Sequence, residues 1–486
     1  MKKKKLSLFK EKISFGTDGW RGILGVDFTL ERLLKVAAAA AQELAYVKEK
    51  KNNKIIIGYD RRFLAEEMAE AVASAVRGVD LVPLLASCSL PTPSCSWGIV
   101  EENALGALVI TASHNPCEWL GLKIKGPFGG SVDSSFTNSV QKRLDAGGIS
   151  IPIEGSTERI DFRKQHLLGI SQKFDLHLIS IGLKKLGVKI FVDSMYGSAA
   201  GCMAELFGSD GDGLIYEIRT IRDPCFGGNP PEPMKVYLAE LIQAVQTSFE
   251  DGQLSIGLVF DGDGDRIAAI DEQGRYCNTQ LLMPVLIDHL ARVKNMSGCV
   301  VKTVSGSDLM RLVSEDLGRE VLEKPVGFKY IAEEMLSRDV LIGGEESGGV
   351  GFGHHLPERD ALYAALVLLE SIVADNKCLG AKIDSLHARF GKSHFDRIDL
   401  TLKDIEMRRN LENFLKKDTP SSIGNKSVLE VITTDGIKLV LDKSHWLMFR
   451  FSGTEPLLRI YCEAPSSSEV TSTLYYAKQL LDNDFG

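Results

Sequence analysis

Two hydrophobic periodicities alternate through about the first 390 residues of this 486-residue chain, and the alternation strongly constrains its fold. The segment 29–47 has the apolar spacing of a helix, and the segment 54–60 that follows is the continuous apolar run of a buried strand. Three later apolar runs, at 189–194, 256–261 and 340–346, end in a polar or acidic residue before a loop. This order predicts α/β layers with buried sheets, whose ligands bind beyond the carboxyl ends of the strands.

The last part of the chain follows a different pattern. Residues 427–442 are typical of a hairpin, residues 446–451 and 457–464 of strands, and residues 466–481 of a closing helix. They predict a small α+β domain of about 95 residues, attached to a longer α/β body. The polar stretch 153–164 predicts a linker within that body.

Composition excludes several classes of protein. The formal net charge of −8 argues against a protein that coats nucleic acid. The nine cysteines include no C-x-x-C pair, which indicates a reducing compartment. The basic start of the chain has no apolar stretch long enough for a signal peptide, and no apolar run approaches the roughly 20 residues of a membrane span. We expect a soluble cytoplasmic protein without nucleic-acid or membrane partners.

The segment TASHNP, residues 111–116, follows an apolar run, and Lys123 stands ten residues after Ser113. One interpretation is a cap or turn closed by Ser113 or Asn115 before Pro116. The other is a nucleophile presented where a strand ends. The neighbouring pair of Ser113 and His114 does not decide between them, because adjacent residues rarely act as nucleophile and base.

A second polar loop, DGDGDR, alternates Asp261, Asp263 and Asp265 with glycines. Three carboxylates this close repel one another unless a cation lies among them. Glu272 falls at the twelfth position, as in an EF-hand, but Arg266 replaces the glycine at the sixth position and the flanks are strand-like. The loop therefore predicts a divalent metal site, with Mg²⁺ favoured by its all-oxygen ligands.

A third polar loop, FRFSGTEPLLRIY, is a candidate phosphate-binding loop. Arg450 and Arg459 flank Ser452, Gly453 and Thr454, so guanidinium groups, hydroxyls and backbone N–H groups could together hold a phosphate. It is not a Walker A loop, because G-K-[ST] is absent. By itself it could equally be an ordinary polar hairpin turn.

Five motifs in this order resemble the α-D-phosphohexomutase family, and the resemblance covers nearly the whole chain. They are ISFGTDGWRG (13–22), TASHNP (111–116), DGDGDR (261–266), GEESGG (344–349) and RFSGTEP (450–456). The resemblance implies an α/β fold, with three similar α/β domains in series plus a smaller C-terminal α+β domain around a central cleft. The expected domains are 1–157 with a phosphoserine loop, 158–274 with a metal loop, 275–389 with a sugar-binding loop, and 390–486 with a phosphate-binding loop.

The resemblance also implies a reaction. Ser113 would carry a phosphoryl group, and Asp261, Asp263, Asp265 and a phosphoserine oxygen would bind Mg²⁺. The enzyme would donate its phosphoryl group to a hexose monophosphate. The resulting hexose 1,6-bisphosphate would turn around in the cleft and rephosphorylate Ser113. Such a mutase acts on small-molecule hexose phosphates as an intramolecular phosphotransferase.

Other positions match further family residues. Lys123 and Arg21 match basic groups beside the reacting group, and Lys123 is a candidate for proton transfer with a pKa that nearby cations would lower. His114 is expected to orient the serine loop. Candidate substrate-binding residues are Glu345 and Ser347 for sugar hydroxyls, Arg450, Ser452, Gly453, Thr454 and Arg459 for phosphate, and Lys329 and His354 near the sugar.

Departures from the family pattern bear on the sugar. Leu120-Gly121 stands where the family usually has Asn-Gly, which affects a loop contact only. Family members acting on mannose phosphates commonly have a histidine at the position of Gly349, whereas His354 is more similar to the glucose branch. We therefore expect glucose 1-phosphate as best substrate, mannose 1-phosphate second and glucosamine 1-phosphate weakest. Phosphoglucosamine mutase is the alternative, followed by a metal-dependent sugar phosphatase. A sugar-phosphate-binding protein without activity would be expected to have lost Ser113 or an aspartate.

Overall fold

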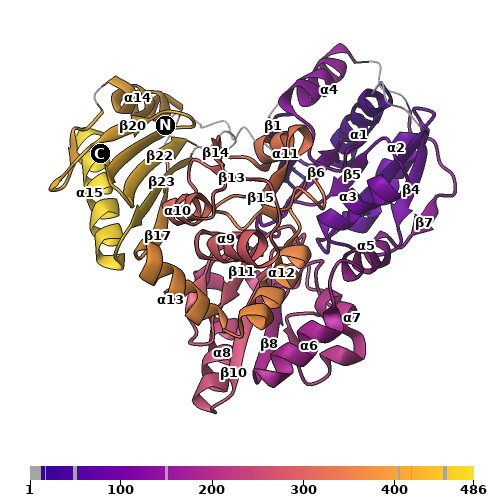
Figure 1. Cartoon of the computed structure of the whole chain (residues 1–486). Coiled ribbons are helices and arrows are strands. Elements are labelled where there is room, and N and C mark those ends of the chain that lie inside the picture. The colour runs from indigo at the N-terminus through magenta and orange to yellow at the C-terminus, as the bar shows by residue number, and fades with distance from the viewer. Residues whose placement is uncertain are drawn as a thin grey trace.

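The computed structural model describes residues 13–16, 18–46, 52–147, 151–402, 405–417, 419–451 and 457–485. Figure 1 shows successive α/β units that meet near the centre of the molecule, with a smaller unit at the C-terminal end. The architecture is mixed α/β, as the alternating periodicities predict. Within the described ranges, we find no helix with the length and apolar character needed to cross a membrane.

The first unit is built on a seven-stranded sheet with helices α1 (Leu30–Ala45), α2 (Ala65–Arg77), α3 (Thr92–Glu101) and α4 (Ser134–Ala146). Its strand order is β1 (Phe15–Gly16), β2 (Gly19–Ile23), β6 (Trp119–Lys125), β5 (Ala107–Ile110), β3 (Lys54–Tyr59), β4 (Val82–Ala86) and β7 (Glu158–Ile160). Helix α1 begins after Thr29, whose hydroxyl accepts the Arg32 N–H. Strand β3 is buried from Ile55 onward, as its continuous apolar run predicts.

Strand β7 corrects one sequence expectation. The polar stretch 153–164 was expected to be a linker, yet its residues 158–160 pair in parallel with β4 and extend the first sheet. Helix α5 (Phe162–Ser171) then begins at the end of the stretch, with the Asp161 side chain as its N-terminal cap.

The second unit has a five-stranded sheet in the order β12 (Tyr276–Cys277), β11 (Ile267–Ile270), β10 (Leu254–Phe260), β8 (Val188–Asp193) and β9 (Ile215–Ile218). Its helices are α5, α6 (Leu176–Lys185), α7 (Cys202–Phe207) and α8 (Ala239–Glu250), with short 3₁₀ turns at Gly208–Gly211, Phe226–Gly228 and Lys235–Tyr237. Strands β10 and β11 form an antiparallel pair that encloses the acidic loop. The flanks of that loop are therefore strands, as the sequence predicts.

The third unit has a four-stranded sheet in the order β14 (Val321–Lys324), β13 (Cys299–Thr303), β15 (Val340–Gly344) and β16 (Val350–Gly351). Its helices are α9 (Thr279–Asp288), which continues as a π-helical turn at His289–Val293, α10 (Asp308–Asp316), α11 (Phe328–Ser337), α12 (Ala361–Asp375) and α13 (Leu379–Phe390). Strand β15 ends directly before the loop that carries Glu345 and Ser347.

The fourth unit has an antiparallel sheet in the order β17 (His394–Thr401), β23 (Leu457–Ala464), β22 (His445–Phe451), β21 (Ile437–Asp442) and β20 (Glu430–Ile432). Helices α14 (Ile405–Lys417) and α15 (Ser467–Phe485) contribute apolar side chains to its core, and β18 (Ser422–Ile423) and β19 (Lys426–Ser427) form a small hairpin. The hairpin predicted at 427–442 is present as β20 and β21.

The hydrophobic cores do not follow the sheets one to one. The first and fourth units each have their own large apolar cluster. The second and third units share one cluster, because side chains of α9 and α12 pack together with those of α5, α6 and the second sheet. The two middle units therefore form a single packed body.

Candidate active site

The serine loop connects β5 to β6 and is held by a buried arginine that the sequence did not single out. Arg62 Nη2 donates to the carbonyl oxygens of Ser113 and Asn115 at 2.7 and 2.6 Å, and Nη1 donates to that of Pro116 at 2.8 Å. Ser113 has a φ of +53°, an uncommon conformation for a residue with a side chain. The Thr111 hydroxyl stabilises it by accepting the Ser113 N–H at 2.8 Å. Ser113 is thus a fixed, strained turn residue.

Ser113 faces the acidic loop. Its Oγ donates to Asp261 Oδ2 at 2.9 Å, although the two residues are 148 positions apart. A Cβ on Gly262 would lie only 2.5 Å from the Ser113 carbonyl oxygen, so this close approach of the two loops requires glycine. The loop after β5 in the first sheet thereby meets the loop after β10 in the second sheet, which places the serine hydroxyl against the carboxylates.

The acidic loop has the chemistry of a metal site. Asp261, Asp263 and Asp265 are fully buried and each offers an oxygen within 4.8 Å of the others. Asp263 Oδ1 and Asp265 Oδ1 have no hydrogen-bond partner among the described residues, which leaves buried anionic oxygens for a cation. Burial, and then Asp265 and Asp263, raise the pKa of Asp261 well above its ordinary value. The donor set therefore fits a hard divalent cation such as Mg²⁺.

Lys123 lies among the same carboxylates. Its Nζ is 2.9 Å from Asp18, 2.8 Å from Asp263 and 2.7 Å from Asp265, and its side chain is 1% exposed. Burial alone would lower the pKa of Lys123, but these carboxylates outweigh it and raise the pKa above the ordinary lysine value. The expected lowering of this pKa is wrong, because three carboxylates contact Lys123 Nζ directly and together outweigh both burial and the charge of Arg359. Lys123 is an ammonium here.

Arg359 completes the charged cluster and was not singled out from the sequence. Its Nη2 lies 2.8 Å from both Asp18 and Asp265, and its Nη1 lies 3.5 Å from Glu345. Arg359 thus joins the metal loop to the loop expected to hold the sugar. Its signal in the sequence was limited to the charged run PERD before an apolar helix.

Arg21 contacts the serine loop, and His114 is part of it. Arg21 Nη1 donates to Asn115 Oδ1 at 2.6 Å, and the ring Nδ1 of His114 is 3.3 Å from Ser113 Oγ. Burial, followed by the charges of Arg266 and Arg21, lowers the pKa of His114 well below its ordinary value, so the imidazole is neutral.

A cavity of about 480 Å³, which we call the cleft, opens beside these residues and is lined by residues of all four units. His114 and Arg21 come from the first unit and Arg266 from the second. The remaining sequence-predicted residues that line it are Glu345, Ser347, Lys329, Arg450 and Arg459. Lysine and arginine side chains outnumber the acidic ones in its lining, which favours a ligand with more than one phosphate.

Two groups of the predicted substrate-binding residues are not among those that the structure places in this lining. Ser452, Gly453 and Thr454 lie outside the described residues. His354 is described, but it does not line the cavity; its Nε2 is 2.8 Å from the Tyr363 hydroxyl on α12. The structure therefore gives His354 no place in the cleft. Conversely, Arg397 on β17 lines the cleft and was not singled out from the sequence.

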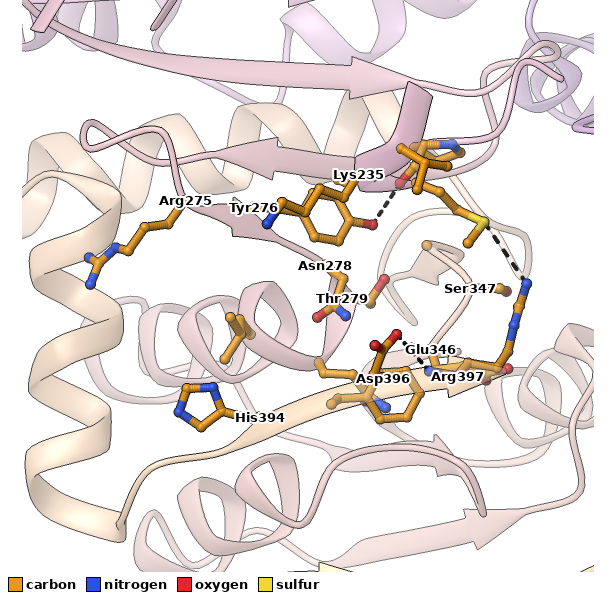
Figure 2. Close-up of a pocket in the computed structure, with 18 of the residues that line it drawn as sticks. Lys235, Arg275, Tyr276, Asn278, Thr279, Glu346, Ser347, His394, Asp396 and Arg397 are labelled. Atoms are coloured by element: carbon orange, nitrogen blue, oxygen red, sulfur yellow. Dashed lines mark hydrogen bonds between the residues drawn. The ribbon is translucent and has the colours of Figure 1, made fainter. Parts of the chain in front are cut away.

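A second cavity, of about 690 Å³, is lined by residues of the second, third and fourth units. Figure 2 shows Ser347 and Arg397 at one end of it and Arg275 and His394 at the other. Glu346, Ser347 and Arg397 line both cavities. Among the described residues, Ser113 and the three aspartates line neither cavity, but their neighbours His114 and Arg266 line the first and not the second, so the chemistry belongs to the first.

Comparison with known proteins identifies relatives that match nearly the whole chain. Four consecutive segments match the families described as phosphoglucomutase/phosphomannomutase, with alpha/beta/alpha domain I at residues 12–148, domain II at 166–274, domain III at 278–390 and the C-terminal domain at 401–474. A phosphoglucomutase/phosphomannomutase of Thermococcus kodakarensis is 28% identical over 477 residues, covering 96% of this chain and 98% of the relative.

Two further similarities extend over nearly the whole chain. A phosphoglucosamine mutase of Carboxydothermus hydrogenoformans is 29% identical over 459 residues, covering 92% of this chain and 94% of the relative. A crystal structure described as a "putative phosphomannomutase" from Thermus thermophilus superposes with a TM-score of 0.83 at 31% identity, covering 97% of this chain and 99% of the other.

Proposed function

Because this chain belongs to the α-D-phosphohexomutase family and is therefore an intramolecular phosphotransferase, we propose that it interconverts hexose 1-phosphate and hexose 6-phosphate with glucose as the preferred sugar. The observation that carries the proposal is the contact of 2.9 Å between Ser113 Oγ and Asp261 Oδ2, beside a basic cleft lined by all four units. A serine in this position can store a phosphoryl group between the two halves of the reaction.

Asp261, Asp263, Asp265 and an oxygen on Ser113 are the proposed ligands of Mg²⁺. When bound, the ion supplies positive charge that offsets the negative charge of the transferring phosphoryl group. Asp263 Oδ1 and Asp265 Oδ1, which have no hydrogen-bond partner among the described residues, support this assignment.

The protein's own cations act around the same point. Lys123 of the first unit and Arg359 of the third unit both contact Asp265, and Arg21 lies beside the serine loop. We assign to Lys123 and Arg21 the orientation of the reacting phosphoryl group, and to Lys123 a hydrogen bond to the sugar oxygen that gains or loses it. The neutral imidazole of His114 orients the serine hydroxyl.

The sugar is proposed to bind Glu345 and Ser347, which line the cleft on the loop after β15. Gly349 on the same loop allows Arg359 to pass, since a Cβ there would lie 2.4 Å from Arg359 Cδ. A histidine at this position, as in the mannose pattern, could not coexist with the present placement of Arg359. This supports a site that differs from the mannose pattern.

The phosphate that is not being transferred is proposed to bind the basic side of the cleft. Arg450, Arg459, Lys329 and Arg397 line it far along the chain from Ser113. Two separate anion positions in one cleft would allow a hexose 1,6-bisphosphate to bind in either orientation. Ser452, Gly453 and Thr454 remain candidates for the same phosphate.

Glucosamine 1-phosphate is the alternative substrate. Several of the relatives are named phosphoglucosamine mutases, and a second carboxylate, Glu346, lines the cleft next to Glu345, where an ammonium group on the sugar could be attracted. Glu346 already accepts a hydrogen bond from Ser305 at 2.6 Å, which reduces its availability and favours the neutral sugar.

The test compares glucose, mannose and glucosamine 1-phosphates with and without the matching 1,6-bisphosphate. Isomer formation without release of inorganic phosphate supports a mutase, whereas release of inorganic phosphate indicates the phosphatase alternative. The Ser113→Ala variant should bind substrate but lose most turnover, and mass spectrometry should find one phosphate on Ser113 of the active enzyme. Near-full activity of this variant would contradict the proposal, and a tenfold preference for glucosamine 1-phosphate would overturn the sugar alone.

A further inference from the structure

A buried hydrogen-bonded network centred on Asp360 lies outside both cavities, within the part of the chain that the structure describes. Asp360 Oδ2 accepts Nε2–H groups from His166 at 2.8 Å and from His355 at 2.7 Å. Its Oδ1 accepts the Tyr363 N–H at 3.1 Å and so caps the start of α12. The three side chains of the network are 0% exposed.

The outer ring nitrogens are paired as well. His166 Nδ1 is 3.0 Å from the Ser94 hydroxyl on α3, and His355 Nδ1 is 3.1 Å from Lys173 Nζ. An ammonium can only donate, so His355 accepts at Nδ1 and donates at Nε2, which makes it a neutral imidazole. The network therefore joins the first unit, α5 and the third unit through satisfied hydrogen bonds.

The separations identify hydrogen bonds rather than a metal site. The atoms of two ligands on a tetrahedral zinc ion lie about 3.4 Å apart, given metal–ligand distances of about 2.1 Å. The nitrogens of His166 and His355 are closer than this to Asp360 Oδ2, at 2.8 and 2.7 Å. The trio is thus set for direct donation to the carboxylate.

Both ends of the network lead to the acidic loop. On one side, Asp360 follows Arg359 in the chain, and Arg359 Nη2 lies 2.8 Å from Asp265. On the other side, α3 carries Ser94 and begins at Thr92, which donates its N–H to the Asp263 carbonyl at 2.8 Å and its hydroxyl to Asp263 Oδ2 at 2.6 Å. The network therefore connects Arg359 and Thr92, two residues that contact the acidic loop.

On the basis of the proposed function, we propose that His166, Asp360 and His355 form a positioning element, which fixes Arg359 relative to Asp263 while the phosphoryl group moves. None of the three needs to touch substrate. A displacement of about 1 Å in a reacting site can cost about a hundredfold in rate. Loss of the network should therefore lower turnover while leaving the cleft able to bind hexose phosphate.

The first experiment compares Asp360→Ala with Asp360→Asn. Asparagine can keep the helix cap through Oδ1, and its amide N–H can then donate to His166 if that ring changes tautomer, because the Ser94 hydroxyl can accept as well as donate; it loses the bond to His355, whose Nε2 is itself a donor. We expect Asp360→Ala to lower kcat by about ten- to a hundredfold with little change in KM, and Asp360→Asn, which keeps the cap and the bond to His166, to recover part of it. The control is Asp175→Ala, which removes the cap of α6 (Asp175 accepts the Leu178 N–H at 2.9 Å) and should leave kcat unchanged.

The second experiment is a double-mutant cycle with Arg359→Lys. If Asp360 acts through Arg359, the losses in kcat should be far from additive, since the arginine is already compromised. Should Asp360→Ala fail to fold, His166→Gln enters the same cycle. Additive losses, a rise in KM without loss of kcat, or an Asp360→Asn variant as impaired as Asp360→Ala would overturn the inference. A wild-type enzyme without mutase turnover would instead overturn the proposed function.

Discussion

Replacing Lys123 by methionine tests the electrostatics of the site, because it removes one buried ammonium and keeps the length of the side chain. Three carboxylates within 2.9 Å of Nζ then lose this partner, and within the described residues only Asp18 and Asp265 of the three keep an ion pair with Arg359. Breaking a buried ion pair by removing one partner costs about 3–5 kcal/mol, so the variant should unfold at a distinctly lower temperature in EDTA. It should also lose turnover.

The stabilisation by Mg²⁺ should increase in this variant, whereas its stability without metal should fall. In the metal-free protein Lys123 competes with a cation for Asp263 and Asp265, so its removal should strengthen Mg²⁺ binding and enlarge the rise in melting temperature that Mg²⁺ produces. Calorimetric titration and thermal unfolding at matched Mg²⁺ concentrations measure both effects. The matched control is Lys125→Met, which removes a buried lysine that contacts Glu358 and Asp18 instead of the metal loop. A Lys123→Met variant that responds to Mg²⁺ less than wild type would refute the reasoning.

Three other outcomes can be checked directly. Asp263→Asn should weaken Mg²⁺ binding by about tenfold or more and lower turnover, and EDTA should inhibit the wild type until Mg²⁺ is restored; full activity without metal would contradict this. Gly349→Ala should displace Arg359, because its Cβ would lie 2.4 Å from Arg359 Cδ, and kcat measured at saturating substrate should fall about tenfold or more. Burial and then Lys302 lower the pKa of Lys438 to about 8. Because an unfolded lysine titrates near pH 10.5, the unfolded chain binds more protons between these values, so this group adds stability as pH rises from about 8 to 10.5. The rise should be absent from Lys438→Met in thermal unfolding across that range.

The residues that the sequence identified lie in short motifs whose chemistry is local. Asp261, Asp263 and Asp265 repel one another within five positions, so a cation follows from the spacing alone. Ser113 could be assigned only together with the other motifs, since a serine before a proline turn is common. The structure places it beside Asp261, which is 148 positions away in the chain. The alternation of helices and strands likewise predicted the layered fold, because hydrophobic period is a local property.

What the sequence could not provide depends on contacts between distant segments. Arg62 is the second of two consecutive arginines and Arg359 stands in the run PERD, contexts that signal no role, and Arg359 meets Asp18 across 341 positions. The sequence motifs suggest a lowered pKa for Lys123 beside other cations, whereas the fold brings three carboxylates from distant segments within 2.9 Å of its Nζ and raises the pKa. His354 was placed near the sugar by its spacing from the Glu345 loop, yet its ring bonds Tyr363 instead.

The apolar cluster shared by the second and third units has a consequence for how the chain can be divided. Each middle sheet would expose side chains of α9, α12 or α6 if it were expressed without the other, so a fragment containing only one of them would lack part of its own interior. The first and fourth units, with interiors of their own, are the natural pieces for truncation or exchange between relatives. Recombination within this enzyme should therefore exchange three modules, although the described residues form four large sheets.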